Sequence, residues 1–304
     1  MISVVVPCYN AARTAAATIE SALAQDAPVE VIAIDDGSSD DTAAVLKGFG
    51  SRIQAQFGPN RGVSAARNSA AAAASGDWLL FLDSDDLLTP GTLARRLQSS
   101  ADDVDLVACH WREFQEIDGA IVEGEVRKLR PIPPGPDAEV VVATDAWAPP
   151  AALLYRRSVV EAIGGFRPDL PVIQDARYLF DAVHRGARVA VSDHVGARYR
   201  VVEGSLSRRN PGQFWSDVLL NGRQIEGLWR ERPGLDPMRL AALRAIYDQA
   251  ARGLLAAGDE RFFEAEREAR RLGGRTRQVA AAGLLARSLG LANASRVVSW
   301  VTRR

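Results

Sequence analysis

The segment Gly76-Asp77-Trp78-Leu79-Leu80-Phe81-Leu82-Asp83-Ser84-Asp85-Asp86-Leu87-Leu88-Thr89-Pro90 joins a short apolar run to a group of acids. The run at 78–82 is too short for a helix, and its length and flanks are typical of a strand buried on both faces of a parallel sheet. Asp83, Asp85 and Asp86 follow at once. Like charges this close repel one another unless something positive lies among them.

Two interpretations of these acids remain open. Alternation along an extended chain places Asp83 and Asp85 on the same side, where two carboxylates at the carboxyl edge of a sheet suit a divalent cation that also holds phosphate oxygens. Alternatively, the acids form a loop that caps the helix expected from about Pro90. A cap uses one carboxylate, so the metal site is the favoured interpretation.

Composition indicates an ordinary soluble globular protein of one large or two modest domains, with 304 residues, 47% of them apolar and 25% charged. The net charge of -1 gives no general attraction to nucleic acid or to an anionic membrane. Cys8 and Cys109 are too few for a disulfide framework, and we expect reduced, buried thiols in a cytoplasmic protein. Because the chain starts with a strand, we expect no signal peptide, and no apolar run approaches the roughly 20 residues of a membrane span.

Strands and helices alternate through the first third of the chain. We expect strands at 2–6, 29–34, 53–57, 78–82 and 106–109, with amphipathic helices between them. This order predicts an α/β fold with an open, doubly wound, mostly parallel sheet, which binds ligands beyond the carboxyl ends of its strands.

Polar residues follow three of these strands, namely Tyr9-Asn10, Asp35-Asp36 and Asp83-Asp85. Ser38 or Ser39 can cap the helix after the second strand, but Asp35 and Asp36 precede that cap and need another explanation. No G-x-G-x-x-G and no G-x-x-x-x-G-K-[ST] is present, which disfavours dinucleotide redox chemistry and phosphate-loop NTPase chemistry.

The expected order of strands and helices is less regular in the second part of the chain. We expect a hairpin at 111–130 around Asp118-Gly119, a Pro-rich loop at 131–136, a strand at 151–155, helices at 157–163 and 175–185, and short strands at 189–191 and 196–201. From about Pro211 the pattern is helical. We therefore divide the chain into a domain at 1–208, with halves at 1–110 and 111–208, and a C-terminal helical region at 209–304.

The tail has two interpretations. No acid follows Glu268, whereas arginines continue to the end beside Leu284, Leu285, Leu289, Val297, Val298, Trp300 and Val301. This composition suits a helix lying on an anionic bilayer. Alternatively, these helices pack on the rest of the chain or form a homodimer.

Five stretches in order resemble the family-2 glycosyltransferases, which have the GT-A fold, and the resemblance covers about residues 1–205. They are Val4-Val5-Val6-Pro7-Cys8-Tyr9-Asn10, Asp35-Asp36-Gly37-Ser38-Ser39-Asp40, Asn60-Arg61-Gly62-Val63-Ser64-Ala65-Ala66-Arg67-Asn68, Leu82-Asp83-Ser84-Asp85-Asp86, and Gly164-Gly165-Phe166 followed by Gln174-Asp175. The resemblance makes 1–110 the nucleotide-sugar-binding half and 111–208 the acceptor-binding half.

The resemblance also implies a site for a nucleotide-diphospho-sugar, with a UDP-sugar as the expected donor. The residues expected to bind it are Pro7, Tyr9, Asn10, Asp36, Asn60, Arg67, Asp83, Ser84 and Arg200. Asp85, with Asp83, matches the D-x-D pair that holds Mn²⁺ or Mg²⁺, and Asp86 is expected to be a helix cap or to support that pair.

The same resemblance makes Asp175 the catalytic base, which takes the proton of an acceptor hydroxyl. The other interpretation of Asp175 is the N-cap of the helix that starts there. Gln174 stands where the family often has Glu, which removes one like charge beside Asp175. Val202 stands where many relatives have a His that helps to hold the metal or the diphosphate. The basic end of this region is either a diphosphate clamp or a solvated loop, and comprises Arg198, Arg200, Ser205, Ser207, Arg208 and Arg209.

These features predict an inverting, metal-dependent glycosyltransferase of bacterial cell-surface polysaccharide or glycolipid synthesis. We expect a carbohydrate or lipid-linked acceptor, no nucleic-acid partner, and a cytoplasmic location with peripheral contact at the inner face of the membrane. The alternative is a nucleotide-sugar-binding or scaffold protein on the same fold with weak or absent catalysis. A sugar nucleotidyltransferase is disfavoured, since no Gly-rich phosphate loop with Lys or Arg follows the first strand.

Overall fold

The structure is a computed structural model that describes the chain except residues 118, 203, 205–208, 232–234, 274–275 and 303–304, and except the side chains of 289 and 297–302. Its contacts divide the chain into two compact units, Met1–Val202 and Glu203–Arg304. The division falls a few residues before the boundary expected after residue 208. Ser205, Ser207 and Arg208 of the expected basic segment lie outside the described residues.

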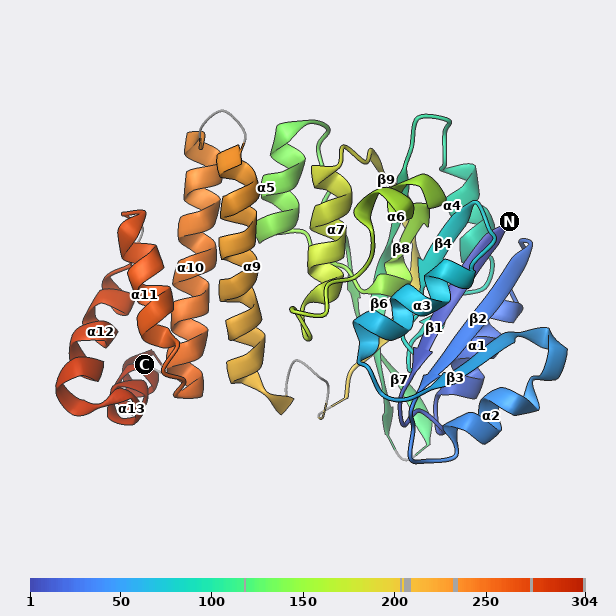
Figure 1. Ribbon diagram of the computed structural model, residues 1–304, viewed down its shortest axis with the longest axis horizontal. Coiled ribbons are helices and arrows are strands. Elements are labelled where there is room, and N and C mark those ends of the chain that lie inside the picture. The colour runs from blue at the N-terminus through green and yellow to red at the C-terminus, as the bar shows by residue number, and fades with distance from the viewer. Residues whose placement is uncertain (118, 203, 205–208, 232–234, 274–275, 303–304) are drawn as a thin grey trace. The chain divides into compact units, whose positions relative to one another are not determined.

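The first unit begins with a parallel half-sheet. Its strands run in the order β3-β2-β1-β4 and comprise β1 (Ile2–Cys8), β2 (Val29–Asp36), β3 (Gln54–Gly58) and β4 (Trp78–Phe81). Every residue of β1 and β4 is buried, as expected for strands covered on both faces. The connecting helices are α1 (Ala15–Leu23), α2 (Thr42–Gly48) with the short η1 (Gly50–Arg52), and α3 (Val63–Ala73). Figure 1 shows the first three strands as neighbouring blue arrows.

The remaining strands make the sheet mixed. β8 (Leu153–Arg156) is antiparallel to β4 and to β6 (Leu106–Ile117), whereas β9 (Val189–Arg200) is parallel to β6. β5 (Leu87–Leu88) joins the edge of β9, and β7 (Ala120–Arg127) forms the expected hairpin with β6, whose turn residue Asp118 is not described. The helices here are α4 (Thr92–Gln98), α5 (Pro136–Thr144), η2 (Pro150–Ala152), α6 (Arg157–Ile163) and α7 (Gln174–His184). The predicted α/β class is confirmed, with its parallel part confined mainly to the first four strands.

One local prediction in this region is wrong, and one helix was missed. The strands expected at 189–191 and 196–201 are one strand, because bulges opposite His110 let β9 continue through the polar residues 193 and 194. Helix α5 was not expected after the Pro-rich loop. Its buried Ala138 and Val142 pack it near α7, and its first residue is Pro136, where a missing N–H costs nothing.

An aromatic cluster fastens α7 to the centre of the sheet. Phe81 of β4 meets Phe166 and Tyr178 edge-on, at centroid distances of 4.7 and 5.5 Å, and Phe166 stacks on Tyr178 at 3.9 Å. Such pairs add about 0.5–1.5 kcal/mol each beyond area burial. The first turn of α7, which carries Asp175, is therefore held at a fixed place relative to the end of β4.

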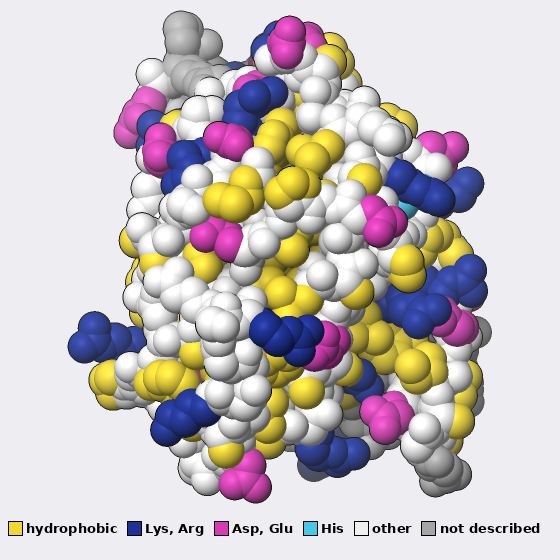
Figure 2. All heavy atoms as spheres, turned by 90° about the vertical axis from the view of Figure 1, so that its right-hand side faces the viewer, with side chains coloured by type: hydrophobic (Ala, Val, Ile, Leu, Met, Phe, Trp, Pro, Cys, Tyr) yellow, Lys and Arg dark blue, Asp and Glu magenta, His cyan; other side chains and the backbone are white. Residues whose placement is uncertain are grey.

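On the face drawn in Figure 2, acidic and basic side chains are interspersed with hydrophobic ones rather than gathered by sign. This distribution is in keeping with a formal net charge of -1. The face therefore presents no single-sign field that would steer a charged polymer.

The second unit is helical, as expected, and consists of α9 (Pro211–Glu231), α10 (Pro237–Ala257), α11 (Phe262–Arg271), α12 (Arg277–Leu289) and α13 (Leu291–Thr302). Asp236 and Thr276 cap α10 and α12 by accepting the N–H bonds of Arg239 and Val279. None of the described helices is both long enough and apolar enough to cross a membrane. The apolar side chains at 289, 297, 298, 300 and 301 are not described, so bilayer contact and dimerisation stay predictions.

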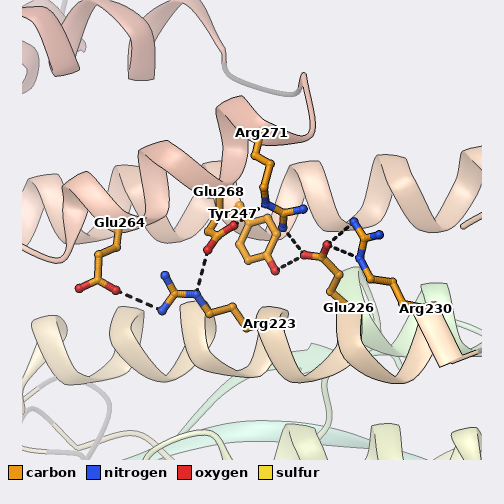
Figure 3. Close-up of polar contacts among 7 residues, drawn as sticks. All are labelled: Arg223, Glu226, Arg230, Tyr247, Glu264, Glu268 and Arg271. Atoms are coloured by element: carbon orange, nitrogen blue, oxygen red, sulfur yellow. Dashed lines mark hydrogen bonds and ion pairs between the residues drawn. The ribbon is translucent and has the colours of Figure 1, made fainter.

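Glu226 is the centre of a polar network among α9, α10 and α11 (Figure 3). Its carboxylate is 5% exposed and accepts bonds from Arg271 Nη2 at 2.6 Å, Tyr247 Oη at 2.7 Å and Arg230 Nε at 2.8 Å. Burial alone would raise the pKa of Glu226, but these bonds outweigh it and lower the pKa to about 2.

We expect Glu226→Gln to lower the free energy of unfolding by about 1–3 kcal/mol at neutral pH, because the amide keeps the shape but loses charge-assisted bonds. A lowered folded-state pKa stabilises the fold above the usual carboxyl pKa, and this contribution is lost as pH falls through about 2. Urea unfolding at several pH values should show the gap between wild type and variant closing in acid. Glu264→Gln is the control, because the Glu264 side chain is 47% exposed and its described ion pair is with Arg223. Equal losses in both variants would contradict the assignment.

Candidate active site

The loops after β1 and β2 are bonded to each other at the carboxyl edge of the sheet. Asn10, which has a positive φ of 50°, donates its N–H to Ser38 Oγ at 2.9 Å, and its Oδ1 accepts the N–H of Ser39 at 2.8 Å. The expected capping role of Ser38 or Ser39 is wrong: α2 has Asp41 at its N-cap, and the N–H of its first residue, Thr42, is accepted by Asp40 Oδ1 at 3.0 Å. The serines instead bond Asn10, leaving the neighbouring Tyr9 ring 54% exposed.

Asp36 organises the loop after β3. Its two carboxylate oxygens accept the N–H groups of Arg61 and Gly62, each at 2.8 Å. Gly37 has φ +73°, and a Cβ there would lie 2.5 Å from the backbone nitrogen of Asn60, so only glycine fits this approach. These contacts explain why an acid precedes the helix cap. They also bring Asp36, Asn60 and Tyr9 to one edge of the sheet, next to Pro7, which pairs with Ile34.

Arg67 links the acids after β4 to the helical layer. It lies on α3, is 1% exposed, forms an ion pair with Asp83, and places its guanidinium 4.9 Å from the centroid of Phe166. Among the described residues its Nε and Nη1 have no hydrogen-bond partner. The sequence pointed to Arg67 only through the family resemblance, and its pairing with Asp83 was not foreseen.

Asp85 differs from Asp83 because no described side chain bonds its carboxylate. The adjacent Ser84 is half-buried, and its side chain makes no described hydrogen bond. Burial, followed by the charge of Asp83, raises the pKa of Asp85 to about 6.

Asp86 is 1% exposed and accepts the backbone N–H of Arg200 at 2.8 Å, so it supports the end of β9 and is not a helix cap. Arg200 returns the contact by donating Nε to the carbonyl of Asp85 at 2.9 Å, and Nη1 to Glu116 at 3.0 Å.

The donor set for a cation here is small. Across the part of the chain that the structure describes, no group of three or more His, Cys, Asp or Glu could hold a metal ion. His110, His184 and His194 each bond nearby protein groups instead. Asp85 nevertheless fits a hard divalent cation: it is a half-buried carboxylate next to Asp83, and it forms no ion pair with a side chain that the structure describes. Two carboxylates leave the remaining positions to water and to phosphate oxygens.

Asp175 is the second residue of α7 and not its cap, since Ile173 stands at the N-cap. Its Oδ2 lies 3.4 Å from Trp147 Nε1. Burial raises the pKa of Asp175, the charge of Arg67 opposes that rise, and the charge of Asp83 adds to it. Arg67 thus pairs with the acid after β4 and also acts electrostatically on the acid of α7.

Three aromatic residues near Asp175 were missed by the sequence analysis, namely Trp111 on β6, Trp147 after α5 and Tyr199 on β9. Burial raises the pKa of Tyr199 well above its usual range, and the charges of Asp86, Asp83, Asp175 and Asp85 add to the rise. Its hydroxyl therefore lies among the same acids. Tyr199 begins the stretch at 199–208 that resembles a family segment closing over the diphosphate, but its own role was not foreseen. Trp111 and Trp147 belong to none of the quoted motifs, so only spatial proximity identifies them.

The comparisons with known proteins agree with this geometry. The chain is 31% identical over 223 residues to the succinoglycan biosynthesis protein ExoO of Rhizobium meliloti (strain 1021), covering 68% of this chain and 62% of that protein. It is 27% identical over 220 residues to the putative glycosyltransferase EpsH of Bacillus subtilis (strain 168), covering 68% and 63%. The chain thus spans less than two thirds of the length of these curated relatives.

Solved structures share the fold. The crystal structure of S. aureus TarS 1-349 in complex with UDP-GlcNAc has a TM-score of 0.68 and 20% identity, with 99% of this chain and 91% of that chain covered. A mannosyltransferase from Pyrobaculum calidifontis in complex with GDP-Man and Mn²⁺ has a TM-score of 0.59 and 18% identity, with 99% and 84% covered. At this identity the likeness concerns the fold, and it agrees with the predicted GT-A architecture.

The model of the family described as glycosyl transferase family 2 matches residues 3–164, which hold β1 to α6 and all of the acids at the ends of the parallel strands. With the ordered loops, the Arg67–Asp83 pair and the curated relatives, this match shows that the chain belongs to glycosyl transferase family 2.

Proposed function

We propose that this protein is an inverting glycosyltransferase that moves a sugar from a nucleotide-diphospho-sugar to an acceptor hydroxyl. One observation carries the proposal: the buried Arg67 pairs with Asp83 at the donor edge and acts electrostatically on Asp175. The acid expected at the donor and the acid expected to take the proton therefore share one charged neighbour. Transfer requires that the two substrates meet at this point.

A UDP-sugar is the proposed donor. The edge formed by Pro7, Tyr9, Asp36 and Asn60 offers an exposed aromatic ring, carboxylate lone pairs and backbone groups to a base and ribose. Two structures with this fold are complexes with UDP-GlcNAc and with GDP-Man and Mn²⁺, which supports a nucleotide-sugar donor, and binding measurements would identify its base.

Asp85, with Asp83, would hold Mn²⁺ or Mg²⁺. When bound there, the ion would act as a Lewis acid that stabilises the negative charge of the departing diphosphate. Arg200, whose side chain is 10% exposed and tied to the carbonyl of Asp85, keeps the acidic turn in place. Arg67 holds Asp83 by an ion pair, whereas Asp85 forms no ion pair with a described side chain.

Asp175 then accepts the proton of the acceptor hydroxyl as that oxygen attacks the anomeric carbon from the face opposite the diphosphate. This direct displacement inverts the anomeric configuration. Arg67 favours the ionised form of Asp175, which is the form that can take a proton, against the burial that disfavours it. Domain 1–208 would carry the reaction, with 111–208 as its acceptor-binding half.

The proposed setting is bacterial cell-surface polysaccharide or glycolipid synthesis, with a carbohydrate or lipid-linked acceptor. The name of a relative refers to succinoglycan biosynthesis, which supports this setting. Cys8 and Cys109 are free and buried, as expected for a reducing cytoplasm, and we propose that location.

Asp175→Asn should leave donor binding nearly unchanged and lower turnover on the order of 10²-fold or more, because the amide keeps the shape but cannot take a proton. When kcat/KM of the wild type is plotted against pH, activity on the acid side should be lost at a pH above the usual pKa range of a carboxyl group. Burial raises the pKa of Asp175, and only its ionised form acts as base. NMR coupling constants of the product should show inversion. Asp169→Asn, an exposed acid, is the control. Near-normal turnover of the Asp175 variant, or a retained configuration, would refute this role.

Asp85→Ala should abolish Mn²⁺-dependent binding of UDP in calorimetry, because the diphosphate would meet the acids without a bridging cation. Thermal stability at neutral pH should be equal or higher, since one of the crowded acids is gone. Asp102→Ala, an exposed acid in a loop, should change neither quantity. An unchanged Mn²⁺-dependent affinity in the Asp85 variant would exclude it as the metal ligand.

Gln174→Glu should raise the pKa of Asp175 further and move the acid limb of kcat/KM upward. Gln174 is 5% exposed, and its Oε1 has no hydrogen-bond partner among the described residues, so a carboxylate there would be buried and uncompensated. Because a raised folded-state pKa costs stability above the unfolded value, the loss should be largest at neutral pH and shrink in acid. Gln54→Glu, on an exposed position of β3, should leave both unchanged. An acid limb that stays in place would contradict the expectation.

The alternative of a binding or scaffold protein makes a different prediction. Such a protein would bind the nucleotide-sugar in the presence of Mn²⁺ but show neither transfer nor slow hydrolysis. A panel of nucleotide-sugars, with binding and turnover measured on the same samples, distinguishes the two.

A further inference from the structure

We propose that Trp147 is the surface on which a pyranose ring of the acceptor stacks, so that one hydroxyl of that ring is presented to Asp175. This inference rests on the proposed function and specifies the chemistry of its second substrate: the acceptor end that enters the site is a pyranoside. It also assigns a specificity-determining role to a residue outside every matched sequence motif.

The indole of Trp147 is held in a fixed orientation although it lies on the loop between α5 and η2. Trp111 of β6 meets it at 5.7 Å and 86°, and Tyr199 of β9 meets it at 5.7 Å and 81°. Both contacts are edge-to-face, which is a favoured arrangement of aromatic rings. Ligand binding to this ring therefore costs little side-chain conformational entropy.

The same indole is 42% exposed, whereas Trp111 is 5% exposed. A large aromatic side chain that served only packing would be covered, as Trp111 is. Trp147 instead keeps much of its surface open, and its Nε1 lies beside the proposed base. Exposed aromatic residues with fixed orientation are typical anchors for ligands.

The contact with Asp175 fixes where the carboxylate lies relative to the indole ring of Trp147. Trp147 Nε1 lies 3.4 Å from Asp175 Oδ2, so the carboxylate borders the edge of the indole. A ring stacked on the indole face at van der Waals distance, about 3.5–4.0 Å, can place a hydroxyl from its rim within hydrogen-bond reach of the carboxylate. This is the geometry that a general base requires.

The chemistry of the surroundings favours a sugar over an alkyl chain. A pyranose has an apolar face of C–H groups and a rim of hydroxyls, which match an indole face beside a carboxylate and a phenol. The Tyr199 hydroxyl makes no described hydrogen bond, and its raised pKa keeps it protonated and able to donate. An alkyl chain in the same place would bury Asp175 and Tyr199 without partners, which is costly.

The test uses the full-length protein with UDP and Mn²⁺ and ligand-detected saturation-transfer NMR. The probes are methyl pyranosides of glucose, galactose, mannose and N-acetylglucosamine in both anomeric forms, with octyl glucoside as the probe of an alkyl occupant. At least one methyl pyranoside should receive saturation, most strongly at the C–H protons of one ring face.

Three variants separate the interpretations. Trp147→Ala should weaken binding of that pyranoside about fivefold to tenfold, whereas Trp147→Phe should keep much of it, because a ring remains although the N–H bond to Asp175 is gone. Phe57→Ala is the control: Phe57 is 47% exposed, and Lys47 lies 5.3 Å from its ring centroid. The Ala variant should also raise the acceptor KM by a larger factor than it changes acceptor-free hydrolysis of the donor, since both reactions use Asp175 but only the acceptor stacks on the indole.

Several results would overturn the inference. Unchanged saturation in Trp147→Ala, saturation of octyl glucoside confined to its alkyl protons, saturation of no methyl pyranoside, or equal losses in the Ala and Phe variants would each do so, the last by indicating that the indole only positions Asp175. These failures are distinct from a failure of the proposed function, which would appear as absent nucleotide-sugar binding and hydrolysis in the wild type.

Discussion

The ion pair between Arg67 and Asp83 is the interaction on which the arrangement of the site depends. A guanidinium that is 1% exposed cannot lose its water without a compensating charge, and Asp83 supplies that charge from the end of β4. The cation also lies over the Phe166 ring, whose neighbour Tyr178 belongs to α7. Three segments distant in the chain, α3, the acidic turn and α7, are therefore fixed relative to one another.

The acids of the site differ because their neighbours differ. Asp83 is compensated by Arg67, Asp86 by the backbone of Arg200, and Asp36 by two amides of the loop after β3. Asp85 forms no ion pair with any side chain that the structure describes, and burial together with the charge of Asp83 raises its pKa to about 6. One acid of the group is thus left ready for an added positive charge, and the others hold the backbone around it.

The site has two sides with different character. The edge with Tyr9, Asp36 and Asn60 is built from loops that bond each other through backbone groups, which suits the flat base and ribose of a nucleotide. The side beyond Asp175 is built from aromatic rings on β6, β9 and the loop after α5. Arg67 pairs with Asp83, and Trp147 contacts Asp175, so each of the two acids is tied to one of these sides. The proposed transfer needs both acids at one place.

Local pattern was sufficient for much of this protein. The buried strands, the order of the polar strand ends, the acids after β4 and the helical second unit were all predicted, because apolar periodicity and turn residues act over a few neighbouring positions. The partners were not predictable: Ser38 and Ser39 bond Asn10 instead of capping α2, β9 continues through its bulges, α5 follows the Pro-rich loop, and Trp147 contacts Asp175. Each of these depends on contacts between residues far apart in the chain, and only packing of the whole sheet and its helices selects them.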